Sequence, residues 1–292
     1  MSDTLVNQAV SALTDAGNIR RWPVSGGVRR RRLAGSVIPP LVFVAVLVAV
    51  WGAATELFGV PADILPAPGA VLGSLADAWR SGVMLQSVAA SLGRALVGFA
   101  LAVVVGTLTG LVLAEVSALR RAVGPVISGL MVLPSVAWVP AATLWFGLSD
   151  ALVYFVVLMG AVPSIVNGLL SGTDHVPPQT RRLAAVLGAS RISRALLMVL
   201  PAALPGYVAG VKQGWAFAWR GVLAAEIIAV GGGLDAGVGA LLQHGRESAD
   251  LAAVLAAIIV ILAIGILIEL VVLAPIERGV LRRRGLTPGE VR

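Results

Sequence analysis

The sequence predicts an all-α polytopic membrane protein with six transmembrane helices and both termini in the cytoplasm. Of its 292 residues, 58% are hydrophobic and 13% are charged, whereas a soluble domain usually carries about 25% charged residues. The apolar residues gather in stretches long enough to cross a bilayer as helices. With the N-terminus inside, 17 of the 22 lysine and arginine residues fall in cytoplasmic segments, and only Arg80 and Arg246 fall outside. This asymmetry predicts the orientation, and it accounts for the net charge of +7 without nucleic acid.

Residues 1–36 precede the first predicted span and are polar and basic. Arg20, Arg21 and the arginines at 29–32 supply the charge, and apolar character begins at Val37. A secretory signal would have a shorter charged region, a shorter apolar core and a small-residue cleavage site. We therefore expect a disordered cytoplasmic tail that leads into an uncleaved first span. The tail could bind anionic lipid, although a role as a topology signal alone also explains its charge.

The transmembrane domain is expected over residues 37–275, and its third span is interrupted. Pro134 and Pro140 lie inside that span, so neighbouring helices or water must satisfy the backbone carbonyls that the prolines leave without a partner. The six predicted spans cover residues 37–55, 92–114, 123–148, 151–172, 206–230 and 251–275.

The segments between the spans are expected to be short and polar. Val60–Pro68 is rich in proline, which favours an extended chain, and it leads into a short amphipathic helix on the outer membrane surface. The outer segment 231–250 is expected to end in a polar loop, for which solvation is explanation enough. Residues 276–292 form a second basic cytoplasmic tail.

The sequence lacks the motifs of several classes of enzyme. It has no cysteine, which excludes disulfides and thiolate metal sites, and its two histidines, His175 and His244, lie too far apart in sequence to suggest a metal cluster. Lys212 is its single lysine and does not lie in a phosphate-binding Gly-x4-Gly-Lys-Ser/Thr loop. Neither a Gly-x-Ser-x-Gly serine site nor a His-Glu-x-x-His zinc site is present. We expect no enzymatic activity and no cofactor in this chain.

The fifth span carries an unusual set of charged and aromatic residues. Charged side chains are costly in lipid and usually face a protein interior or a water-filled cavity. The spacing of the set places most of its members on roughly one helical face, with the second cation beside them. Two interpretations follow: a polar stripe along a translocation path, or a structural ion pair of Arg220 with Glu226 and tryptophans as packing. The candidate path residues are Lys212, Trp215, Trp219, Arg220 and Glu226.

The cytoplasmic loop 173–205 contains the stretch RLAAVLGASRISRALLMVLP, from Arg182 to Pro201. Its composition favours helix, and Gly188 to Ser190 favour a turn between two short helices. Pro201 is tolerated at the start of a helix. Four arginines mark the loop as cytoplasmic, so it is either a simple basic connector or a short helical platform that binds a partner.

This stretch resembles the cytoplasmic "EAA" loop of bacterial ABC-importer permeases, whose pattern is Glu-Ala-Ala, three residues, Gly, nine residues, Ile, one residue, Leu-Pro. The resemblance covers roughly residues 35–285, and the sequence is most similar to the nitrate/sulfonate/taurine branch, with a likeness to aliphatic sulfonate permeases. One departure is that Arg182-Leu183-Ala184 stands where the family has Glu-Ala-Ala, which puts the role of that glutamate in doubt. The residues that match the pattern or common family wording are Gly188, Ala189, Ser190, Arg191, Met198, Leu200 and Pro201.

The resemblance implies a type I ABC-importer permease in a bacterial plasma membrane. Besides the lipid bilayer, it implies three partners: a cytoplasmic ATPase subunit that binds the Gly188 region, an extracytoplasmic substrate-binding protein, and a second permease copy in a homodimer. The ATPase subunit would hold ATP and Mg²⁺. The outer loop near His244 could meet the substrate-binding protein.

The resemblance and the charges indicate the same class of solute. Arg94 lies near the end of its span and is expected to extend towards the membrane surface or to pair there. Together with Lys212 and Arg220 it would suit an anion, and the fifth span resembles that of sulfonate-type members. An aliphatic sulfonate is therefore the expected solute, with nitrate, taurine and a vitamin precursor as alternatives. A stand-alone secondary transporter or channel is the alternative class. Such carriers typically show repeated halves with paired broken helices, and we find no convincing repeat.

Overall fold

The computed structural model describes residues 28–175, 190, 193, 198–230 and 233–283, and the chain divides into two units after Leu57. In the first unit the described residues form one helix, α2 (Val28–Leu57). Its residues 42–50 are all exposed, as suits an apolar helix that is covered by lipid or protein. Residues 28–36 are helical rather than disordered as expected, and residues 1–27 lie outside the described part.

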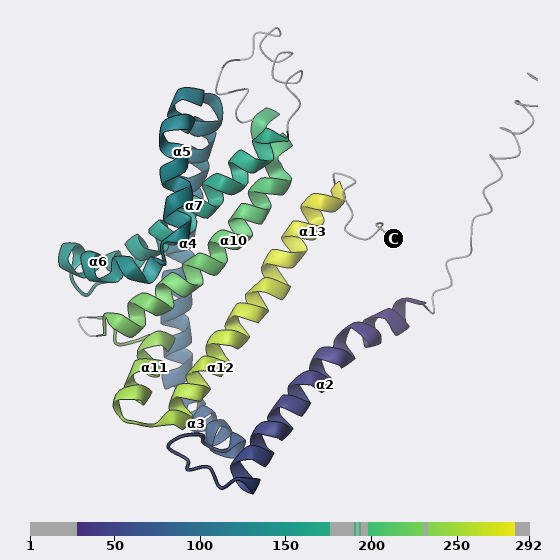
Figure 1. Cartoon of the computed structure of the whole chain (residues 1–292), viewed down its shortest axis with the longest axis vertical. Coiled ribbons are helices and arrows are strands. Elements are labelled where there is room, and N and C mark those ends of the chain that lie inside the picture. Colours follow the sequence, from purple (N-terminus) through teal and green to yellow (C-terminus); the bar gives the residue numbers. More distant parts are fainter. Residues whose placement is uncertain (1–27, 176–189, 191–192, 194–197, 231–232, 284–292) are drawn as a thin grey trace, which may run out of the picture. The chain divides into compact units, whose positions relative to one another are not determined.

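The second unit consists of helices, with no strand among its described residues (Figure 1). In chain order its elements are α3 (Pro68–Arg80), α4 (Val83–Glu115), α5 (Ser117–Val132), the 3-10 turn η1 (Ser135–Trp138), α6 (Val139–Phe146), α7 (Asp150–Asp174), α10 (Leu200–Ile228), α11 (Val238–Glu247), α12 (Leu251–Ile268), the π-helical turn η3 (Glu269–Leu273) and α13 (Ala274–Arg283).

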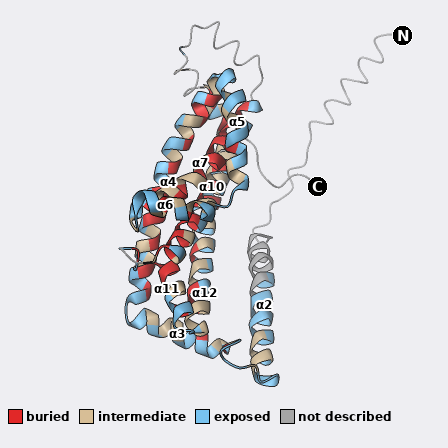
Figure 2. Ribbon diagram, turned by 60° about the vertical axis from the view of Figure 1, so that its left-hand side comes forward, coloured by how far each residue is buried: buried red, intermediate tan, exposed pale blue. Residues whose placement is uncertain are grey.

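Helix α7 lies at the centre of this unit, between α4 and α10, and buried residues concentrate along α7 and α10 (Figure 2). Glycines bring α7 and α10 into backbone contact. A Cβ atom added to Gly168 would lie 2.4 Å from the Cα of Gly210, and one added to Gly172 would lie 2.3 Å from the carbonyl oxygen of Ala203. Only small residues permit helices to approach so closely.

The third predicted span is broken more sharply than its prolines alone required. Helix α5 ends at Val132, and Leu133 has an extended backbone, as expected for a residue before proline. The pair formed by Ser117–Val132 and Ser135–Phe146 bends by 101°. It is therefore a bent pair of short helices rather than a straight span over 123–148.

Within the described part of the chain, three helical segments are long and apolar enough to cross a membrane: Val83–Glu115, Asp150–Asp174 and Leu251–Arg282. The bent pair becomes a fourth if it is counted as one span. Helix α10 has 29 residues, which at 1.5 Å per residue exceeds the thickness of a hydrocarbon core.

Several element boundaries differ from those expected. Helix α10 begins at Leu200, with Pro201 in its first turn, so the end of the predicted 173–205 loop is helical. The outer segment, expected to be a polar loop, contains α11 (Val238–Glu247). Residues 276–283 of the predicted tail lie in α13.

Candidate functional site

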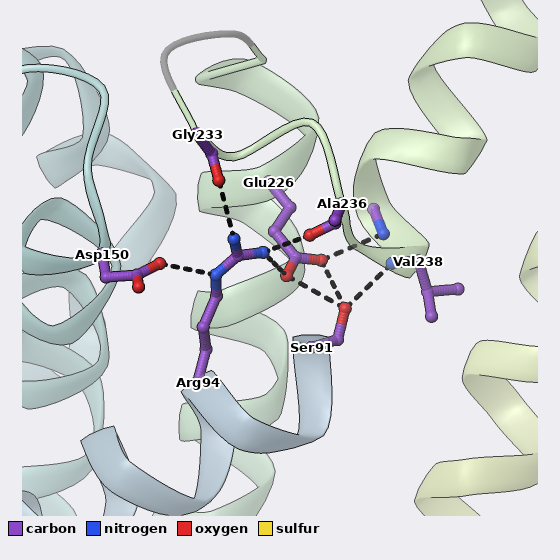
Figure 3. Close-up of polar contacts among 8 residues, drawn as sticks. Ser91, Arg94, Asp150, Glu226, Gly233, Ala236 and Val238 are labelled. Atoms are coloured by element: carbon purple, nitrogen blue, oxygen red, sulfur yellow. Dashed lines mark hydrogen bonds and ion pairs between the residues drawn. The ribbon is translucent and has the colours of Figure 1, made fainter. Parts of the chain in front are cut away.

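The C-terminal end of α10 carries a buried carboxylate, that of Glu226, which is fully enclosed. Its Oε1 accepts hydrogen bonds from the hydroxyl of Ser91 at 2.9 Å and from Nη1 of Arg94 at 2.9 Å. Its Oε2 accepts from the same hydroxyl at 2.7 Å and from the backbone N–H of Gly239 at 3.1 Å. Both oxygens are therefore fully engaged (Figure 3).

Arg94 of α4, which faces Glu226, is buried and engaged on every nitrogen. Its Nε donates to Oδ1 of Asp150 at 2.7 Å, Nη1 donates also to the carbonyl of Ala236, and Nη2 donates to the carbonyl of Gly233 at 3.1 Å. Asp150 opens α7. One guanidinium thus joins α4, α7, α10 and the segment that leads into α11 (Figure 3).

The start of α11 is pressed against the same carboxylate. The N–H of Val238 donates to the hydroxyl of Ser91 at 2.9 Å. A Cβ atom added to Gly237 would lie 2.5 Å from the carboxyl carbon of Glu226, and one added to Gly239 would lie 2.7 Å from its Cβ. No room is left for a solute at Glu226. The contacts of Ser91, Arg94, Asp150 and Glu226 therefore fix the α10–α11 connection to α4 and α7.

Lys212 lies near the middle of α10, and its ammonium group is neutralised. Its Nζ is 2.7 Å from Oε1 of Glu269 and 2.9 Å from Oε2 of Glu277. Glu269 opens the π-helical turn η3 and Glu277 lies in α13. The contacts tie α10 to the last helices of the chain, and the charge of Lys212 is already engaged.

The two tryptophans of α10 pack inside the unit. Trp215 and Trp219 are 5% and 7% exposed. The ring of Trp215 meets that of Phe99 in α4 edge to face, with centroids 5.3 Å apart. Trp219 lies beside Gly265 of α12, within 4 Å of the position that a Cβ would take there. Both rings fill space between helices.

Arg220 differs from the other four candidates because its side chain is exposed. Its Nε donates to the carbonyl of Ala216 one turn earlier at 3.0 Å, and its guanidinium lies 4.9 Å from the ring centroid of Phe217. No carboxylate among the described residues pairs with it. The structural pair for Glu226 is therefore Arg94, not Arg220. The exposed residues Gln213, Ala216 and Arg220 form the open face of α10. Arg220 presents a free positive charge on this face.

Most of the predicted coupling stretch lies outside the described residues. Arg182, Leu183, Ala184, Gly188, Ala189 and Arg191 are among those not described. Ser190 accepts a hydrogen bond from the N–H of Ser193 at 3.1 Å. Met198 is half-buried just before α10, and Leu200 and Pro201 begin that helix.

Sequence reasoning found Glu226 but not its partners. Arg94 was expected to extend towards the membrane surface or to pair near the end of its span; it pairs, with two carboxylates. Ser91 and Asp150 gave no signal of their own, because they come to Glu226 only when α4, α7 and α10 pack. The informative signal was the presence of two opposite charges, Arg94 and Glu226, inside apolar segments.

The sequence was compared with known proteins. Residues 102–275, more than half of the chain, match the family described as "binding-protein-dependent transport system inner membrane component". The chain belongs to this family. It is 30% identical to the taurine transport system permease protein of Escherichia coli, over 86% of this chain and 88% of the relative. It is 26% identical to the putative aliphatic sulfonates transport permease protein of Bacillus subtilis, over 86% and 87%. It is 28% identical to the nitrate import permease protein of Synechocystis, over 80% and 86%.

Family membership confirms the resemblance that the loop suggested. As a binding-protein-dependent permease, the chain is an inner-membrane subunit of an ABC importer and is not itself an enzyme. ATP hydrolysis belongs to a separate subunit, and a substrate-binding protein is a further partner.

Proposed function

We propose that this permease forms the translocation path for a small anionic solute, an aliphatic sulfonate. The observation that carries the proposal is Arg220, a cation on the open face of α10 without a carboxylate partner among the described residues. A lipid-facing arginine at mid-span would cost on the order of 3 kcal/mol or more. An anion in a water-filled path offsets that cost. The relatives named for sulfonates, taurine and nitrate support this class of solute, and a vitamin precursor is a further alternative.

The five predicted path residues take different parts in this proposal. Arg220 contacts the solute. Trp215 and Trp219 hold α10 against its neighbours, and Glu226 fixes its outer end. Lys212 borders the path with its charge balanced by two glutamates. The path is therefore proposed to follow the open face of α10 rather than its buried stripe.

The proposal includes six spans with both termini in the cytoplasm and a homodimer of permeases. The arginine asymmetry supports the orientation. Among the described residues, three apolar helices and the bent pair account for up to four of the spans, and α2 and α10 are proposed as the other two. A second permease copy would form the side of the translocation path that faces Arg220, and would so separate this charge from lipid. Exposed apolar side chains such as Val132 (83%) and Leu144 (87%) also require lipid or protein cover.

The ATPase subunit is proposed to bind the stretch around Gly188 and to hold ATP and Mg²⁺, with no cofactor in this chain. The spacing from Gly188 to Pro201 supports this assignment, since it follows the family pattern. The alternative class, a stand-alone secondary transporter or channel, would leave that spacing unexplained.

Uptake by the reconstituted complex tests the proposal. The permease is placed in proteoliposomes with its ATPase and binding protein, and ATP-dependent uptake of labelled alkanesulfonate, taurine and nitrate is measured per complex. Arg220→Gln should lower uptake of the preferred anion at least about tenfold, because a charge-assisted hydrogen bond is lost. The matched control is Arg80→Gln on α3, whose side chain is exposed. Normal uptake by Arg220→Gln, with the complex intact, would remove Arg220 from the path.

A further inference from the structure

A polar cavity of about 410 Å³ lies between α5 and α7. Arg120 and Ser128 of α5 line one side, and Asn167, Ser171 and Asp174 of α7 line the other. Asp174 is the last residue of α7, so the cavity lies towards the end that precedes the predicted coupling stretch. None of the residues predicted for the path lines it.

Three of the lining side chains have unused hydrogen-bonding capacity. In the part of the chain that the structure describes, the hydroxyls of Ser128 and Ser171 have no hydrogen-bond partner. Asn167 donates one N–H of its Nδ2 to the sulfur of Met131 at 2.7 Å, and the second N–H of that amide has no acceptor there. Polar groups left without partners in lipid are costly. They therefore require water, a solute or another protein surface.

Among the described residues that line the cavity, the charges cancel. Nη1 of Arg120 donates to Oδ1 of Asp174 at 2.8 Å, and Nη2 donates to Oδ2 at 2.7 Å. This two-point pairing leaves the cavity without net charge but with neutral hydrogen-bonding groups. Such groups hold an oxyanion less tightly than a free guanidinium does, because charge-assisted hydrogen bonds are the stronger kind.

One face of α7 links the cavity to Arg220. Gly160, Asn167, Ser171 and Asp174 are spaced seven, four and three apart, so they share a face of the helix. At the outer end of this stripe, a Cβ on Gly160 would meet Cβ of Ser135 at 3.4 Å and Cβ of Phe217 at 3.5 Å. The guanidinium of Arg220 lies over the ring of Phe217. From Gly160 to Asn167 the helix rises about 10 Å.

We propose that this cavity is a second solute site on the cytoplasmic side of the path, where Ser128, Asn167 and Ser171 bind the oxygens of the anion through neutral hydrogen bonds. The inference rests on the proposed function and extends it. The solute passes from the free charge of Arg220 to a site that binds it weakly, as release into the cytoplasm requires. A phosphate group of an anionic lipid has the same chemistry and is a possible competitor for the site.

Single cysteines test this site directly, because the natural chain has none. Ser128→Cys and, as matched control, Val126→Cys are each placed in the full complex in proteoliposomes. Val126 lies two residues away on α5 and is 61% exposed, so it points to a different side of the helix. A small charged thiol reagent is added from the ATPase side. Ser128→Cys should react, because thiolates form in water, whereas Val126→Cys should stay inert in lipid.

Protection by solute separates the possible occupants. The transported anion should slow modification of Ser128→Cys, and Asn167→Leu in the same background should weaken that protection about fivefold, as the loss of one neutral hydrogen bond implies. A thiol as inert as Val126→Cys would overturn the inference, as would oxidative cross-linking of two permease copies at this cysteine. Protection without solute that depends on anionic lipid would assign the cavity to lipid instead.

The outcome also separates this inference from the proposed function. Uptake of an anion that gives no protection at Ser128→Cys would refute the cavity site and leave the proposed function standing. Reaction at Ser128→Cys with no uptake of any tested anion would refute the proposed function, and the solute site with it.

Discussion

At the scale of single residues, the carboxylate of Glu226 shows what a buried charge in this protein requires. It is completely enclosed and receives hydrogen bonds from Ser91, Arg94 and Gly239. Removing one member of a buried ion pair leaves the other charge without compensation, which costs more than the pair contributes. Arg94 and Glu226 therefore depend on each other for the stability of the outer end of the bundle.

Arg94→Leu should destabilise the folded permease by about 3–5 kcal/mol, since Glu226 would stay buried without its cation. The midpoint of thermal unfolding in detergent measures the effect. The matched control is Arg80→Gln, because Arg80 pairs with Asp77 on the exposed surface and exposed pairs contribute little. Adding Glu226→Leu should recover part of the loss. Equal unfolding midpoints for Arg94→Leu and Arg80→Gln would contradict the stabilising role of the Arg94–Glu226 pair.

Sequence alone could find the charges at this site but not their pairing. Arg94 and Glu226 stand out in apolar segments, yet 132 residues separate them. Their contact depends on how α4 and α10 pack, which no local pattern encodes. The same limit explains why Arg220 looked like an equal candidate for pairing with Glu226. Only the structure shows that the Arg220 side chain is exposed, whereas Glu226 is buried with Trp215 and Trp219.

At the scale of elements, the glycines of α7 and α10 set the distance between the two helices. Gly168, Gly172, Gly206 and Gly210 meet backbone to backbone. Such contact lets van der Waals packing replace the hydrophobic effect, which is absent between helices in lipid. Because α7 also packs on α4, this contact positions the open face of α10 on which Arg220 lies.

Gly168→Ala should disrupt the contact between α7 and α10. The new Cβ would lie 2.4 Å from Cα of Gly210 and 2.8 Å from the carbonyl oxygen of Gly206. Backbone cannot yield as a flexible side chain can, so we expect a loss of about 1–3 kcal/mol. Gly129→Ala in α5 is the matched control, because no atom lies within 4 Å of its Cβ position. Thermal unfolding that ranks Gly168→Ala at or above the control would disprove the tight contact.

Sequence predicted helical elements better than their bends and ends. Hydropathy located apolar stretches at 92–114, 151–172 and 251–275, and each lies within a helical segment that can cross a membrane. Pro134 and Pro140 indicated a break, but its 101° angle depends on how α5 and α6 pack on α7. The segment before Asp250 looked polar enough for a loop. Its helix α11 is held because the N–H groups of its first residues, Val238 and Gly239, donate to the hydroxyl of Ser91 and the carboxylate of Glu226. Ser91 lies far away in sequence.

At the scale of the whole second unit, ion pairs lie near the Glu226 end of α10 and at Lys212 near its middle, and Arg220 between them has none among the described residues. Arg94, Asp150 and Glu226 join helices at one end. Arg120 with Asp174, and Lys212 with two glutamates, join further helices. Of the two cations on α10, Arg220 is the one without a carboxylate partner among the described residues. This arrangement leaves a charge available where an anion would pass.

The proposed orientation assigns the Arg94 cluster to the outer side and the Arg120 pair to the cytoplasm, so it can be tested as a whole. Single cysteines at Ser2, Ser190 and Ser248 are labelled on intact cells with a membrane-impermeant thiol reagent. Ser248 lies at the exposed end of α11 and should react. Ser2 and Ser190 should react only after the membrane is opened, because the arginines around them favour the cytoplasm. The chain's lack of native cysteine makes each signal specific. Labelling at Ser190 but not at Ser248 on intact cells would invert the orientation, and with it the order in which a solute would meet Arg220 and the α5–α7 cavity.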